Sequence, residues 1–158
     1  MVQKMLDILR KYDTPTIINS LEILDSKFRT SGFTNEQLVC TDASLPPIVG
    51  YARTATIKAY DKIDPQIKRE RSLAYYQYVS SGNGPWISVI QDIDQNPGFG
   101  AFWGEVSSNI HKSLGVLGVL TNGSVRDLDV LPKGFQMLAG KICPSHAYVQ
   151  IEETDIPV

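Results

Sequence analysis

The sequence predicts an α/β domain whose second half contains a parallel sheet. Two short apolar runs, residues 86–91 and 116–120, are bounded by turn residues and have the length of buried strands. Between them, residues 101–114 show the apolar spacing of a helix. Parallel neighbours need a crossover connection, so strand, helix and strand in this order favour a parallel sheet. A chain of 158 residues has the length of one domain, and we expect a single domain over residues 1–158.

The first half of the chain predicts three helices and one strand around a long loop. Thr14 can cap a helix in which Pro15 takes the first position, where a missing N–H costs nothing. A loop is indicated over 31–50, which is rich in Ser, Thr, Pro and Gly. In order, the expected elements are a helix up to Lys11, a helix from Pro15 through Leu24, the loop, a strand over 51–60 and a helix over 66–80.

The second half predicts further alternating elements separated by Gly- and Pro-containing turns. Gly115 is expected to end the helix that spans 101–114, because glycine commonly follows the last helical residue. After the strand 116–120, the sequence indicates a turn over 121–124 and a short helix from Val125 to Leu131, followed by strands over 135–138 and 147–151.

Composition excludes several classes of protein. The 15 basic and 17 acidic residues give a net charge of −2, so no basic excess favours binding of DNA or RNA. No apolar run reaches the roughly 18 residues of a membrane span, and the N-terminus lacks the apolar segment of a signal peptide. The two cysteines, Cys40 and Cys143, are interpreted as free thiols of a cytoplasmic protein.

Acidic residues follow the two predicted parallel strands. Asp92 and Asp94 come after one strand and Asp127 after the next, while Glu105 lies early in the helix between them. The right-handed crossover places these loops at one edge of the sheet, where ligands of open α/β sheets bind. Carboxylates beside Arg126 therefore indicate a divalent cation such as Mg²⁺ together with an anionic substrate.

The predicted helix also offers an anion site at its start. Backbone N–H groups of the first turn have no partner within a helix and lie at the positive end of its dipole. We expect Gly104, Glu105, Val106 and Ser107 to present these groups, and Gly104 to let a ligand approach the backbone.

Structural explanations exist for the same residues. Ser124 and Asp127 fit a helix capping box, and Glu105 early in a helix favours the dipole without any ligand. Arg126 can be a solvated surface residue, and Asp92 and Asp94 can be loop carboxylates. His111 is expected on the surface of its helix, whereas His146 opens a strand and stays a candidate for a site. The glycines at 98, 100 and 104 miss the dinucleotide-binding spacing by one residue.

The chain resembles a known family through Gly104-Glu105 followed, after twenty residues, by Arg126-Asp127. This pattern is similar to the acid-x20-Arg-Asp signature shared by the 4-hydroxy-4-methyl-2-oxoglutarate/4-carboxy-4-hydroxy-2-oxoadipate aldolases and the regulator of ribonuclease activity A (RraA). Its context also matches, in Phe102-Trp103, in residues 115–119 and 122–125, and nearer the N-terminus in residues 14–17 and 50–55.

The resemblance implies a compact α/β/α domain of the swivelling β/β/α type, assembled as a homotrimer or homohexamer with active sites between subunits. Its aldolases use Mg²⁺ or Mn²⁺ to split 2-oxo-4-hydroxy diacids and release pyruvate, and many also decarboxylate oxaloacetate. By position, Asp127 would ligate the metal and Arg126 would bind the pyruvyl carboxylate or the developing oxyanion. The amides of Gly104 to Ser107 would hold the carboxylate, and Glu105 would orient metal-bound water and help to move the proton. The implied substrate is a small 2-oxo acid.

Two departures from the family pattern stand out. Asn122 occupies a position where many members carry Asp. Family members also usually continue beyond the position of Val158 with a segment that contains Pro-Gly-Asp and a closing strand. The sequence leaves open whether that segment is missing by truncation or by nature. The alternative to a lyase is a non-catalytic regulatory oligomer that binds a ribonuclease or another protein.

Overall fold

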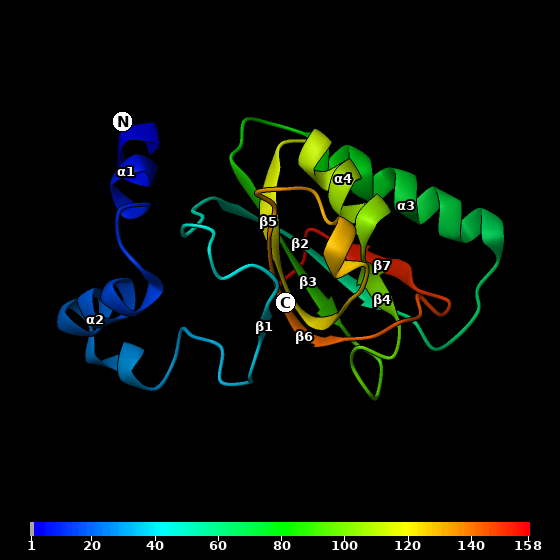
Figure 1. The fold of residues 1–158 in the computed structure, drawn as a ribbon, viewed down its shortest axis with the longest axis horizontal. Coiled ribbons are helices and arrows are strands. Elements are labelled where there is room, and N and C mark those ends of the chain that lie inside the picture. Colours follow the sequence, from blue (N-terminus) through cyan, green and yellow to red (C-terminus); the bar gives the residue numbers. More distant parts are fainter. Residues whose placement is uncertain (1) are drawn as a thin grey trace.

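The computed structural model describes residues 2–158, which form a seven-stranded mixed sheet with two helices on one face and two more at the N-terminus (Figure 1). The helices are α1 (Val2–Leu9), α2 (Thr14–Leu24), α3 (Pro65–Ser80) and α4 (Glu105–Ser113), with short 3₁₀ turns η1 (Ser26–Arg29) and η2 (Leu128–Val130). The strands are β1 (Val39–Cys40), β2 (Tyr51–Lys58), β3 (Trp86–Asp92), β4 (Ala101–Trp103), β5 (Val116–Val125), β6 (Gln136–Ile142) and β7 (Gln150–Thr154).

The sheet is parallel at its centre and antiparallel at its edges. The strand order is β1-β6-β5-β3-β2-β7, and β4 pairs with β5 outside this path. Strands β2, β3, β5 and β6 run parallel, while β1 and β7 pair antiparallel with β6 and β2. The predicted α/β class with a parallel sheet is therefore confirmed. Cys40 and Cys143 are both free thiols, as expected.

The core lies between the sheet and the helices α3 and α4, which run along the same face (Figure 1). Tyr75 of α3 packs with Ile57, Ile90 and Trp103 from three strands, and all four are at most 1% exposed. Burial of each large apolar side chain contributes about 1.5–3 kcal/mol, so this layer fixes the helices to the sheet.

His111 belongs to this core, so the prediction that it lies on the helix surface is wrong. Its side chain is fully buried, and its Nε2 lies 2.8 Å from the Tyr75 hydroxyl. Its Nδ1 lies 2.6 Å from the carbonyl oxygen of Ser107, one turn earlier in α4. Burial lowers the pKa of His111 to about 4, because a charged ring loses its hydration there. The ring is therefore neutral in the folded protein at neutral pH.

Two of the boundaries that differ from the sequence prediction do so because cross-strand pairing overrides local spacing. Residues 101–103 form β4 and not the first turn of a helix, since they pair with the end of β5. The predicted turn over 121–124 is a continuation of β5. There the side chain of Asn122 pairs with the backbone of Asp92, through Oδ1 to the amide (2.7 Å) and Nδ2 to the carbonyl (3.0 Å). These bonds satisfy a polar residue inside a strand.

The N-terminal helices lie apart from the sheet, at the left of Figure 1. The cap of α2 is Asp13, whose Oδ1 accepts a hydrogen bond from Thr16 N at 2.9 Å, and not Thr14 as predicted. Helix α2 buries none of its residues, and Ile23 and Leu24 are 87% and 81% exposed. Arg10 donates to the carbonyl of Val49 at 3.3 Å, which links this arm to the segment before β2. Among the described helices, none has the length and apolarity to cross a membrane.

Candidate functional site

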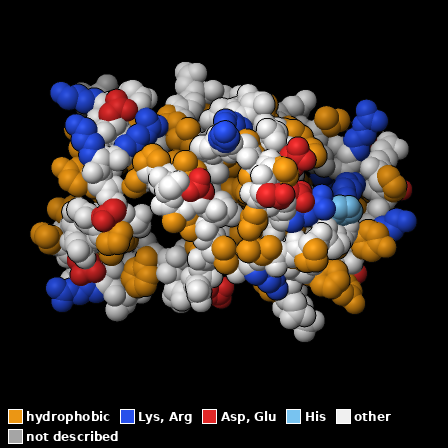
Figure 2. Space-filling model, in the orientation of Figure 1, with side chains coloured by type: hydrophobic (Ala, Val, Ile, Leu, Met, Phe, Trp, Pro, Cys, Tyr) orange, Lys and Arg blue, Asp and Glu red, His pale blue; other side chains and the backbone are white. Residues whose placement is uncertain are grey.

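A pocket of about 250 Å³ lies where the start of α4 meets the end of β5, residues 68–76 of α3 and the start of β7. It brings together the six residues to which the resemblance gives a role: Gly104, Glu105, Val106, Ser107, Arg126 and Asp127. Figure 2 shows acidic, basic and histidine side chains next to one another on the α4 side of the molecule. The pocket is therefore charged with both signs, as a site for a cation and an anion requires.

The first turn of α4 forms one wall. Gly104 is the N-cap, with no side chain to satisfy the following amides. Ser108 makes the first hydrogen bond of the helix, to the carbonyl of Gly104 at 3.0 Å. The amides of Val106 and Ser107 precede it and lie at the positive end of the helix dipole. Helix α4 begins four residues later than expected, and its first turn offers the amides of Val106 and Ser107, whereas the amide of Glu105 donates to Asp127.

Arg126 and Asp127 follow directly after β5. The amide of Arg126 donates to the carbonyl of Trp103 at 2.9 Å, which extends the pairing of β4 with β5. Asp127 then adopts a left-handed conformation, with φ 58° and ψ 40°. This region is sparsely populated by residues other than glycine, although Asp is among the side chains that tolerate it. The backbone reversal brings the Asp127 carboxylate over the start of α4.

The Asp127 carboxylate contacts both other parts of the site. Its Oδ2 accepts a hydrogen bond from the amide of Glu105 at 3.3 Å and lies 3.4 Å from Nε of Arg126. No side-chain bond caps η2, so the capping-box interpretation of Ser124 and Asp127 is wrong. Ser124 is buried in β5 instead, and its hydroxyl has no partner among the described residues. The Asp127 side chain therefore contacts Glu105 and Arg126 in the pocket and makes no hydrogen bond within η2.

These groups approach the backbone of Gly104 closely. A Cβ atom at this position would lie 2.6 Å from Asp127 Oδ2 and 3.0 Å from Cγ of Arg126. The first distance is too short for a side chain to fit unless the carboxylate moves, and the second requires Arg126 to give by a few tenths of an ångström. The backbone of Gly104 is extended, with φ −167°, so its conformation alone does not demand glycine.

The donor set fits a hard cation held partly by a substrate. Within residues 2–158, no three His, Cys, Asp or Glu side chains gather as a set that could enclose a metal ion. Mg²⁺ does not need such a set, because it commonly takes one or two carboxylates and fills its other positions with water and substrate oxygens. Asp127 and Glu105 line the same pocket and supply oxygen donors of this kind.

Asp92 and Asp94 do not line this pocket and brace loops, in line with their structural interpretation. The carboxylate of Asp92 accepts from the amides of Gly98 (2.6 Å) and Asp94 (3.0 Å). The Asp94 carboxylate accepts from the amides of Ala59 and Tyr60 at 2.6 and 3.1 Å. Burial raises the pKa of Asp92, although both of its hydrogen bonds oppose that shift.

Sequence reasoning missed part of the pocket. Lys68, Ser72 and Tyr76 of α3 line it, as do His146, Val149 and Gln150 from the segment that leads into β7. Only His146 had been kept as a candidate. The residues of α3 and β7 lie far from the motif in sequence, and no local spacing distinguishes them from ordinary helix and strand positions.

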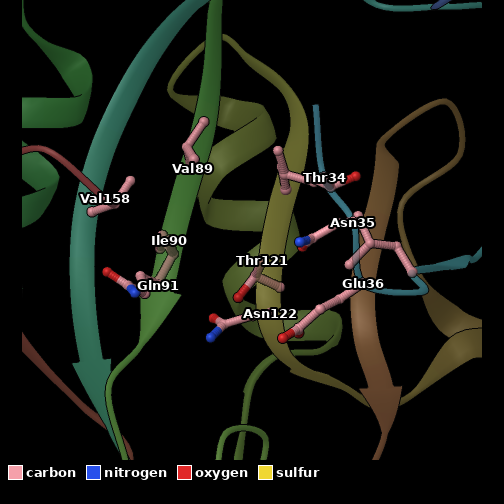
Figure 3. A pocket seen from close by; sticks show the side chains of 11 residues that line it. Thr34, Asn35, Glu36, Val89, Ile90, Gln91, Thr121, Asn122 and Val158 are labelled. Carbon is pink, nitrogen blue, oxygen red and sulfur yellow. The ribbon is translucent and has the colours of Figure 1, made fainter. Parts of the chain in front are cut away.

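A second cavity, of about 420 Å³, lies elsewhere on the sheet (Figure 3). In Figure 3, Asn35 and Glu36 of the long loop face Thr121 and Asn122 of β5. Its lining residues include one carboxylate, Glu36, and no Lys, Arg or His. It offers no cation to pair with an acidic substrate, so the smaller pocket is the better candidate.

Comparisons with known proteins place the chain in a family. The chain matches the family described as RraA-like (Aldolase/RraA) over residues 14–158. No curated protein matches its sequence.

Solved structures of the same fold cover most of the chain. Streptomyces coelicolor RraAS2, described as an unusual member of the RNase ES inhibitor RraA protein family, superposes with a TM-score of 0.71 at 19% identity, over 98% of this chain and 73% of that one. An uncharacterized protein from Pseudomonas syringae pv. tomato gives 0.69 at 18% identity, over 100% of this chain and 66% of that one. The RNA-processing inhibitor RraA from Thermus thermophilis gives 0.55 at 15% identity, over 89% and 77%.

These likenesses establish the fold, and this chain spans about two thirds of the length of the Pseudomonas protein. The family match covers nearly all of the sequence and includes the segment that carries Glu105, Arg126 and Asp127. The chain therefore belongs to the RraA-like family.

Proposed function

We propose that this protein is a divalent-metal-dependent carbon–carbon lyase that acts on 2-oxo acids and releases pyruvate. Its reaction is that of a 4-hydroxy-4-methyl-2-oxoglutarate-type aldolase, an oxaloacetate decarboxylase, or both. The observation that supports it most is the contact of Asp127 with both Arg126 and the amide of Glu105 in one pocket. A ligand there meets a guanidinium, free amides and carboxylate oxygens at once.

Each residue has a distinct task in this proposal. Arg126 and the amides of Val106 and Ser107 bind the carboxylate next to the 2-oxo group, because both present N–H donors to an anion. Asp127 holds the Mg²⁺ or Mn²⁺ ion, with Glu105 as the second oxygen donor of the pocket. When bound, the cation supplies Lewis-acid stabilisation of negative charge on the substrate oxygens.

In aldol cleavage, the bond between C3 and C4 breaks and its electron pair stays with the pyruvate fragment. The 4-hydroxyl group loses its proton and becomes the carbonyl of the leaving fragment, and C3 is protonated afterwards. Glu105 is placed to accept the hydroxyl proton, directly or through water. In decarboxylation of oxaloacetate the same bond breaks, CO₂ leaves, and no hydroxyl proton has to be removed.

We further propose that the protein assembles as a homotrimer or homohexamer. The arm formed by α1 and α2 supports this, because it exposes large apolar side chains such as Ile23 and Leu24. Exposed apolar patches commonly mark protein–protein contacts.

The alternative function, a regulatory oligomer that binds a ribonuclease, is favoured by two structural neighbours, which are described as RNase ES and RNA-processing inhibitors. A pull-down with RNase ES tests it, and lack of binding at micromolar concentration rejects it. The lyase proposal is tested by pyruvate release from oxaloacetate and from 4-hydroxy-4-methyl-2-oxoglutarate, with Mg²⁺ and with a chelator. We expect release with Mg²⁺ only. A folded, Mg²⁺-supplied protein that releases no pyruvate from either acid contradicts the proposal.

A further inference from the structure

One wall of the pocket, formed by α3 and β7, has no part in the proposed chemistry. We call it the α3–β7 wall, and its residues are Lys68, Ser72, Tyr76, Val149 and Gln150. The two elements pack side by side: Arg71 of α3 donates to the carbonyl of Ile151 at 3.3 Å and pairs with Glu152 at 2.9 Å. Lys68 lies one turn before Arg71 on the same side of α3, which places it level with the start of β7.

Lys68 is a half-buried cation without a counter-ion. No carboxylate oxygen lies within 4.0 Å of its Nζ in the described part of the chain, and the five ion pairs found there involve other residues. Lys68 nevertheless lines the pocket that contains Arg126. A charged group that is partly removed from water favours an opposite charge nearby. The pocket therefore holds a second cation that the pyruvyl half of a substrate does not use.

Gln150 presents an acceptor without a donor in the same wall. The residue is 2% exposed, and its Nε2 donates to the carbonyl of Asp61 at 3.2 Å and to Glu152 Oε1 at 3.4 Å. Both of these partners are acceptors, so they fix which end of the amide is the NH₂ group. The remaining Oε1 is buried and has no partner among the described residues. A buried acceptor without a donor carries the cost of its lost hydration, and a hydrogen bond from a donor removes that cost.

We propose that Lys68 determines substrate specificity by binding a second carboxylate, remote from the 2-oxo group, and that Gln150 positions its ammonium by accepting one of its N–H bonds. This inference rests on the proposed function, which places the 2-oxo end of the substrate at Arg126. An ammonium has three donors and can bind the amide oxygen and the carboxylate together. The pocket then selects 2-oxo dicarboxylic acids over monocarboxylic acids of the same length.

A pair of five-carbon acids tests the proposal without any need for turnover. 2-Oxoglutarate has the second carboxylate, and 2-oxopentanoate has a methyl group in its place. Calorimetric titration in the presence of Mg²⁺ gives the ratio of their affinities. For the unmodified protein we expect 2-oxoglutarate to bind roughly tenfold more tightly, the size of effect typical of one charge-assisted hydrogen bond.

Substitutions assign that preference to the wall. Lys68→Met is expected to bring the ratio close to one by weakening only 2-oxoglutarate, and Lys68→Arg to restore most of it. Gln150→Met is expected to lower the ratio in part, provided that its thermal midpoint shows a folded protein. Arg69→Met is the matched control. It removes the same charge from the next residue of α3, which is exposed and lines a different cavity with Gln66 and Leu73, and it leaves the ratio unchanged.

The possible failures are distinguishable. If Lys68→Met keeps the preference for 2-oxoglutarate, or weakens both acids equally, the specificity role is wrong while the lyase proposal stands. If 2-oxopentanoate binds the unmodified protein but Arg126→Met does not weaken it, the proposed orientation in the pocket is wrong. If neither acid binds in the presence of Mg²⁺, the specificity role is wrong, and the lyase proposal falls with it only if no pyruvate is released from its substrates either.

Discussion

The carboxylate of Asp127 caps the helix that begins at Glu105, although the two residues are 22 positions apart in the sequence. Asp127 Oδ2 accepts the hydrogen bond of the Glu105 amide at 3.3 Å. A negative charge at this end of a helix is favourable because it meets the free N–H groups and the positive end of the dipole. The bond ties the end of β5 to the start of α4. The candidate metal ligand and the candidate anion site are therefore held as one unit.

The short distance between the backbone of Gly104 and the Asp127 carboxylate predicts the effect of Gly104→Ala. The added Cβ would lie 2.6 Å from Asp127 Oδ2, and the carboxylate is the end of a flexible side chain that can rotate away. We expect the capping bond to be lost and the rate of pyruvate release to fall at least tenfold, a change equivalent to about 1.4 kcal/mol in the barrier. Steady-state kinetics and a thermal melt measure the two effects, and the melting midpoint is expected to fall by a few degrees because one helix cap is lost.

Gly115→Ala provides the opposite control. Nothing lies within 4 Å of a Cβ at Gly115, but its φ of +85° is unfavourable for alanine. This variant is expected to lose about 1 kcal/mol of stability and to keep its activity. Equal activities of the two variants would mean that the approach of Gly104 to Asp127 is irrelevant to the site.

Buried His111 predicts a pH-dependent stability. Its pKa is about 4 in the folded protein and about 6.5 in an unfolded chain, because burial disfavours the charged ring. As the pH falls below about 6.5, the unfolded state binds a proton that the folded state does not. Stability is therefore lost between about pH 6.5 and pH 4, by an amount on the order of 3 kcal/mol for this group alone.

Urea denaturation at a series of pH values measures this loss, and His111→Gln identifies its source. Other groups titrate in the same window, and the raised pKa of Asp92 acts in the opposite direction. The difference between the two proteins isolates the histidine. We expect the variant to be less stable at pH 7 and to show a shallower decline toward pH 4. If the free energy of unfolding falls equally with pH in both proteins, His111 is not the source of the loss of stability in acid.

The exposed apolar side chains of the arm formed by α1 and α2 predict that charged substitutions there weaken the assembly of subunits. Ile23 and Leu24 are 87% and 81% exposed, and if they contact a second subunit, two glutamates there introduce unpaired charges into the interface. The double substitution Ile23→Glu and Leu24→Glu is expected to shift the mass measured by light scattering from an oligomer toward a monomer. Leu73→Glu changes a 53%-exposed residue of α3 and serves as the control. An oligomer of unchanged mass and stability would place the interface elsewhere.

Much of the sheet could be predicted because its central strands are short apolar runs that have few alternatives. The strand β3, the first half of β5 over 116–120 and most of the helix between them follow from local patterns and turn residues. What failed depends on contacts between distant segments. Ala101–Trp103 has spacing compatible with a helix, and it forms a strand because the end of β5 lies beside it. The central strands can thus be predicted from local sequence patterns, whereas β4 and the end of β5 depend on pairing between segments that are distant in sequence.

The site divides in the same way. Glu105, Arg126 and Asp127 were recognisable because their spacing resembles a family signature and because loops after parallel strands meet at one edge. Lys68 and Gln150 carried no such signal, since they reach the pocket only through the packing of α3 against β7. His111 was misplaced because a single histidine in a helix does not reveal which face is buried. Its partner Tyr75 lies 36 residues away.

The central claim is that Asp127 holds a divalent cation that shares a 2-oxo acid with Arg126. Its most direct test is the affinity for pyruvate, measured by calorimetry with and without Mg²⁺, in the unmodified protein and in Asp127→Asn. Asparagine keeps the size of the side chain and removes the charge that a hard cation requires. We predict that Mg²⁺ tightens pyruvate binding at least tenfold in the unmodified protein and has no effect in the variant. An equal effect of Mg²⁺ on both proteins would contradict the claim.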